Sequence, residues 1–63
     1  MKREKLIKHL IKNGCVLVRE GKKHSIYENA QGITTTVPRH PDIRDDLAKT
    51  ICKQLKISAI GHN

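Results

Sequence analysis

The near absence of aromatic side chains limits the folds open to this 63-residue chain, which has one tyrosine and no phenylalanine or tryptophan. A chain of about 60 residues buries only about 60% of the surface that it exposes when unfolded. Its core must therefore be thin and built from leucine, isoleucine, valine and alanine. We expect one domain over residues 1–63 that is marginally stable alone and that a partner or a dimer would stabilise.

Apolar residues at helical spacing predict a first helix over residues 2–13; they are Leu6, Ile7, Leu10 and Ile11. Gly14 ends this helix, because glycine accepts the left-handed conformation found at helix ends. A second helix is predicted to begin with Asp42 as its N-cap. Its apolar face consists of Ile43, Leu47, Ala48, Ile51, Cys52 and Leu55.

Between the two helices, three short segments rich in β-branched residues predict strands over residues 15–20, 24–29 and 33–37. Residues 30–32 form a turn, and Pro38 ends the third strand. This order predicts an α+β fold of the type α-β-β-β-α. A three-stranded antiparallel sheet carries both helices on one face and leaves the other face open. Ile57 and Ile60 are expected to pack on the core, and residues 58–63 to form a frayed tail.

The positive charge of the chain is concentrated in its first part. The net charge is +7, of which residues 1–24 carry +6 and residues 25–63 carry +1. Such an asymmetry predicts a surface that binds a polyanion. The first helix carries basic residues on the side opposite its apolar face: Lys2, Lys5, Lys8, His9 and Lys12. They are either a solvated face or a row of phosphate ligands, so Lys5, Lys8 and Lys12 are candidate phosphate contacts.

Membrane and metal sites have little support in the sequence. No apolar run approaches the roughly 20 residues that span a bilayer, and charges throughout the first helix do not resemble a secretory signal. Cys15 and Cys52 lie far apart, and the histidines at 9, 24, 40 and 62 lack zinc-site spacing. We therefore expect a cytoplasmic protein with two reduced thiols, no metal and no cofactor.

His24 is the strongest candidate for chemistry. It follows Lys22 and Lys23 in the tight connection between the first two strands, and their charge disfavours the imidazolium form. A neutral imidazole is what a general base needs near pH 7. A lone histidine in a turn is nevertheless more often a simple polar surface residue.

Strand pairing adds other groups to His24. A turn at residues 30–32 places His24 opposite Pro38 and brings His40 to within about 7 Å of it. Arg19, Arg39 and the N-terminus of the second helix are expected at the same end of the sheet. Such a cluster fits RNA cleavage without a metal: a base takes the 2′-OH proton, cations stabilise the charged phosphorane, and an acid protonates the leaving oxygen.

Four segments together resemble the HicA family of toxins, which are messenger-RNA interferases of type II toxin–antitoxin systems. They are Asn13-Gly14, VREGKKHSIYEN at 18–29, TVPRH at 36–40 and LAKTICKQL at 47–55. The resemblance covers about residues 2–57. It implies a double-stranded-RNA-binding-domain-like fold, metal-independent endoribonuclease activity on messenger RNA, and a HicB-type antitoxin that covers the active site.

Carried over by position, the resemblance makes His24 the catalytic histidine. His40 lies in the matching Val-Pro-x-His segment, but the resemblance assigns it no role. The expected clustering at the sheet end is what makes His40 a candidate second acid or base, and Lys22, Lys23, Arg19 and Arg39 candidate phosphate ligands. Lys22 and Lys23 depart from the family loop, which often has small or uncharged residues there. DNA contact is expected only indirectly, through the antitoxin.

Two other functions remain open on the sequence alone. A non-catalytic RNA-binding module would have the same charge distribution, and its RNA binding would weaken with salt in the same way. A small protein-interaction domain would direct its basic surface at an acidic partner instead. The effect of replacing His24 separates the toxin from the binding module, and RNA affinity at low salt separates both from the interaction domain.

Overall fold

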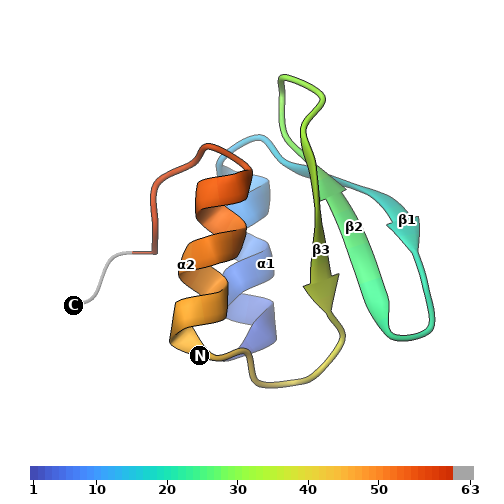
Figure 1. Cartoon of the computed structure of the whole chain (residues 1–63), viewed down its shortest axis with the longest axis vertical. Helices are drawn as coiled ribbons and strands as arrows, with labels where there is room; N and C mark the ends of the chain where they lie inside the picture. The colour runs from blue at the N-terminus through green and yellow to red at the C-terminus, as the bar shows by residue number, and fades with distance from the viewer. Residues whose placement is uncertain (61–63) are drawn as a thin grey trace.

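The computed structural model describes residues 1–60 of the chain. The elements in order are α1 (Arg3–Lys12), β1 (Val16–Glu20), β2 (His24–Glu28), β3 (Thr34–Pro38) and α2 (Asp45–Gln54). The strands form one antiparallel sheet in the order β1-β2-β3. Both helices lie on the same side of this sheet (Figure 1). The predicted α-β-β-β-α architecture is confirmed.

The core lies between the two helices and the covered face of the sheet. As the composition requires, it is almost entirely aliphatic, with one aromatic ring and two thiols. Its buried members are Leu6, Leu10, Cys15, Tyr27, Val37, Ile43, Ala48, Ile51, Cys52 and Leu55. Ile57 and Ile60 pack against this cluster, as predicted. Of the predicted tail over residues 58–63, residues 61–63 lie outside the described part of the chain.

The sequence predicted the end of α1 correctly and the start of α2 incorrectly. Gly14 has a φ of 84° and terminates α1 as predicted. The prediction that Asp42 caps α2 is wrong, because α2 begins at Asp45 and its N-cap is Arg44, which makes no side-chain capping bond. Instead, the segment 41–43 is held extended against the N-terminus: the amide of Arg3 donates to the Pro41 carbonyl at 2.8 Å, and the amide of Ile43 donates to the Met1 carbonyl at 2.8 Å.

The strand β1 contributes almost nothing to the core. All five of its residues are exposed, and the apolar ones, Val16, Leu17 and Val18, keep 46–56% of their surface accessible. The strand lies at the edge of the sheet, and its pairing with β2 is interrupted between Leu17 and Arg19. Such an irregularity bends the edge strand and changes the direction in which the side chains beside it point.

The pairing of β2 with β3 follows the predicted register, with His24 opposite Pro38. The turn between the two strands is fixed by Asn29. Its side-chain oxygen accepts hydrogen bonds from the amides of Gln31 at 2.8 Å and Ile33 at 2.9 Å. Its amide nitrogen donates to the Leu55 carbonyl at 2.8 Å, which ties the turn to the end of α2. Because this turn sets the register, it also sets the position of His24.

Candidate functional site

The loop that carries His24 is a tight connection between β1 and β2. The amide of Gly21 donates to the carbonyl of His24 at 2.8 Å and closes the loop. A Cβ atom at position 21 would lie 3.0 Å from that carbonyl oxygen, closer than ordinary van der Waals contact. Glycine therefore lets the two backbone segments approach closely enough to fix where β2 starts, and with it His24.

One side of His24 is a basic hollow of about 340 Å³. Its lining consists of Lys22, Lys23, His24, Arg39 and His40. The predicted approach of the two histidines is therefore found, because the β2–β3 register delivers both to the same end of the sheet. The cations of such a hollow can bind a phosphate group, and its two imidazoles can donate protons to groups beside that phosphate or accept protons from them.

A second hollow, of about 330 Å³, lies on the other side of the same loop. It shares Lys22, Lys23 and His24 with the first and adds Arg19, Gly21, Ile26 and Thr36. Arg19 is therefore close to His24, as the hairpin predicts, but it lines a different hollow from Arg39 and His40. His24 stands where the two hollows meet.

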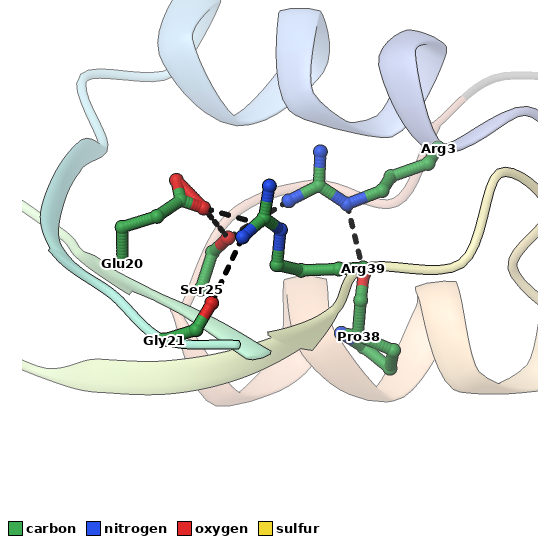
Figure 2. A network of polar contacts seen from close by, with 6 residues as sticks. All are labelled: Arg3, Glu20, Gly21, Ser25, Pro38 and Arg39. Atoms are coloured by element: carbon green, nitrogen blue, oxygen red, sulfur yellow. Dashed lines mark hydrogen bonds and ion pairs between the residues drawn. The ribbon is translucent and has the colours of Figure 1, made fainter. Parts of the chain in front are cut away.

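A network of polar contacts beneath the loop connects it to α1 (Figure 2). Ser25 is completely buried, and its hydroxyl donates to the Glu20 carboxylate at 2.8 Å. The same hydroxyl accepts a hydrogen bond from the Arg3 guanidinium at 2.9 Å, and Arg3 also donates to the Pro38 carbonyl at 2.8 Å. One arginine from α1 thus holds both Pro38, which pairs with His24, and Ser25, which follows His24 in β2.

Arg39 belongs to the same network. Its guanidinium donates to the Gly21 carbonyl at 2.9 Å and lies 3.4 Å from the Glu20 carboxylate (Figure 2). Its backbone amide donates to the Lys23 carbonyl at 3.0 Å. Part of the hydrogen-bonding capacity of Arg39 is therefore used in holding the loop, and its charge is partly balanced by Glu20. Lys22 and Lys23 make no ion pair with any residue of the described part of the chain.

Replacing Ser25 with alanine is expected to lower the free energy of unfolding by about 1–3 kcal/mol, because Glu20 and Arg3 lose the hydroxyl that joins them. Urea denaturation measures this change. The control is Ser58→Ala, the same substitution at an exposed position, for which a change within about 0.5 kcal/mol is expected. Equal effects of the two substitutions would show that the network does not stabilise the loop.

The remaining predicted residues do not reach the hollows. Lys5, Lys8 and Lys12 are exposed along α1 and line neither of them. The expected helix N-terminus is also missing from the cluster, since α2 starts only at Asp45 and contributes no lining residue. Arg3, Glu20 and Ser25 were not identified from the sequence. Alternation along β2 signals that Ser25 is buried beside Tyr27, but nothing in the sequence signals that Arg3 reaches it.

Other features of the described residues offer less chemistry. A larger hollow of about 650 Å³ lies between β3 and α2, but its lining of threonine, aliphatic and glutamine side chains includes no charged or histidine residue. Among residues 1–60, no three histidine, cysteine or acidic side chains gather as a metal site. No helix in that range is long and apolar enough to cross a membrane. Cys15 and Cys52 are free, and burial raises the pKa of both thiols.

Comparison with known proteins gives one match. The model of the family described as "HicA toxin of bacterial toxin-antitoxin" matches residues 3–57 of the 63-residue chain. Searches of curated proteins and of solved structures found no match. The matched range includes both helices, all three strands and both hollows beside His24.

Proposed function

Because the chain belongs to the HicA family of toxins from bacterial toxin–antitoxin systems, we propose that it is an endoribonuclease that cleaves messenger RNA without a metal ion. The observation that supports this proposal best is the hollow in which His24 and His40 lie with Lys22 and Lys23. It combines two groups that can exchange protons near neutral pH with cations suited to a phosphate.

In the proposed reaction, the ribose 2′-oxygen attacks the neighbouring phosphorus. The bond between O2′ and phosphorus forms while the bond between phosphorus and O5′ breaks. One histidine takes the proton of the 2′-OH group, and an acid donates a proton to the departing O5′ oxygen. His24 performs one of these steps and His40 is the candidate for the other. Lys22 and Lys23 stabilise the negative charge that develops on the phosphoryl oxygens.

Five further basic residues have proposed roles outside proton transfer. Arg39 holds the loop through Gly21 and Glu20 and adds positive charge beside the phosphate. Arg19 approaches the RNA from the second hollow. The exposed lysines of α1 (Lys5, Lys8 and Lys12) bind phosphates of the RNA away from the cleaved bond, and this contact strengthens binding in a salt-dependent way.

The family also defines the proposed setting of the protein. Membership implies an antitoxin partner. We propose that this partner is a HicB-type protein that covers His24, and that any contact with DNA runs through the antitoxin. Because messenger RNA is the proposed substrate, the proposed compartment is the cytoplasm.

The experiment that tests this function compares RNA with DNA of the same sequence in the presence of EDTA. The protein is expected to cleave the RNA, since the attacking group is the 2′-OH, and to leave the DNA intact, since DNA lacks it. Gel electrophoresis of end-labelled strands measures both. Cleavage of RNA that EDTA abolishes, or equal cleavage of both strands, would contradict the proposal.

A further inference from the structure

The open face of the sheet carries its own set of side chains beside His24. Ser25 and Tyr27 of β2 point into the core, so His24 and Ile26 point to the opposite face. The same alternation in β3 buries Thr35 and Val37 and leaves Thr36 on the open face. Thr36 is paired with Ile26 across the sheet.

Arg19 of β1 is on the same face. It is paired with Ile26, whereas the next residue, Glu20, is paired with Ser25 and bonds to it on the covered face. Arg19, Ile26 and Thr36 therefore form a row across the three strands. His24 lies two residues from Ile26 along β2, about 7 Å away at the usual rise of a strand.

Arg19 differs from the other arginines of the chain. Arg3 binds Ser25 and Pro38, Arg39 binds Gly21 and Glu20, and Arg44 binds Asp46. Within residues 1–60, the Arg19 side chain has no hydrogen bond and no ion pair. An arginine without a partner on an otherwise polar and aliphatic strand face is free to bind a ligand through its planar guanidinium group.

We propose that the hollow on the open sheet face binds one unpaired base of single-stranded RNA, next to the phosphate held at His24. The proposal rests on the proposed function, because it takes the basic hollow as the site of the cleaved phosphate. The guanidinium of Arg19 stacks on the base, Ile26 provides an apolar surface beneath it, and the hydroxyl of Thr36 faces its polar edge. The two hollows thus hold neighbouring parts of one strand, with His24 between them.

The composition of this face makes Arg19 the main stacking group. Bases in single-stranded RNA are bound by stacking on aromatic rings or on arginine guanidinium planes. The chain has no phenylalanine or tryptophan, and its one tyrosine, Tyr27, is 5% exposed and belongs to the core. The paired bases of a duplex are stacked within the helix, so a base that lies against Arg19 and Ile26 must come from an unpaired strand.

The experiment measures RNA binding in the full chain carrying His24→Ala, which holds the RNA without cleaving it. The probe is a short fluorescein-labelled single-stranded RNA of mixed sequence, used alone and annealed to its complement, and the readout is fluorescence anisotropy. Arg19→Ala is expected to weaken binding of the single strand about 5- to 150-fold, the usual contribution of one stacked base. Binding of the duplex is expected to change much less.

Arg19→Lys separates stacking from charge, because lysine keeps the positive charge but has no planar group. We expect it to bind the single strand as weakly as Arg19→Ala does. The control is Arg44→Ala, which removes an exposed arginine that lines neither hollow. We expect this variant to bind RNA as tightly as the chain that carries His24→Ala alone. Three results would overturn the proposal. They are single-strand binding by Arg19→Lys as strong as that of the His24→Ala chain, an equal loss of duplex binding in Arg19→Ala, and a His24→Ala chain that does not bind the single strand. Failure of the wild-type protein to cleave RNA would contradict the proposed function alone, since binding is measured separately.

Discussion

Replacing His24 with alanine is expected to reduce RNA cleavage about 100- to 10,000-fold, the usual contribution of one general acid or base. His24 lies where the two hollows meet, and no other imidazole of residues 1–60 lines both. Its side chain is exposed, so the substitution leaves the core intact and the protein folded. The initial rate of cleavage of a labelled RNA measures the effect, and growth of cells that express the variant should be restored.

The matched control is His9→Ala. His9 lies on α1, with its Nε2 atom 2.6 Å from the Ser58 carbonyl, and it lines neither hollow. We expect this variant to cleave RNA at nearly the wild-type rate. If His24→Ala also cleaved at the wild-type rate, the catalytic assignment would be wrong. If the wild-type protein bound RNA without cleaving it, and cells grew equally well with the wild-type protein and with His24→Ala, the protein would be an RNA-binding module.

Replacing Leu10 with alanine is expected to lower the free energy of unfolding by about 2–5 kcal/mol, through lost burial and the cavity left behind. Leu10 is fully buried in the aliphatic core. The core of so small a domain rarely supplies more than about 3–5 kcal/mol, so this one change is expected to unfold much of the protein. Circular dichroism during urea denaturation measures the change.

The neighbouring residue provides the control for this prediction. Ile11 follows Leu10 on α1 but is 59% exposed, so Ile11→Ala removes little buried surface. A change within about 0.5 kcal/mol is expected for it. Similar losses from the two substitutions would mean that the helix does not face the sheet as described.

Local patterns in the sequence were sufficient to predict most of the fold. Helical spacing located α1, and the Asn29 turn set the β2–β3 register that pairs His24 with Pro38. His24 and His40 could be placed together because an antiparallel pairing follows from the position of its turn. These features depend on local segments, in which the side chains restrict the conformations that the backbone can adopt.

The parts that could not be predicted depend on contacts between distant segments. Arg3 lies 22 residues before Ser25 and 35 before Pro38 in the sequence, and no pattern in the sequence links these residues. The start of α2 was misplaced because Ile43 looked like part of a helical face, whereas pairing with the N-terminus holds it extended. The apolar residues of β1 gave no sign of their exposure, which results from the edge position of the strand.

The chemical nature of the cut RNA ends tests the proposed reaction most directly. The wild-type protein is incubated with a short RNA of defined sequence in EDTA, and the fragments are identified by mass spectrometry. Attack by the 2′-OH group near His24 predicts one fragment that ends in a 2′,3′-cyclic phosphate and another that begins with a 5′-hydroxyl. Fragments with a 3′-hydroxyl and a 5′-phosphate would show that water attacks instead, and would contradict the proposed role of the histidines.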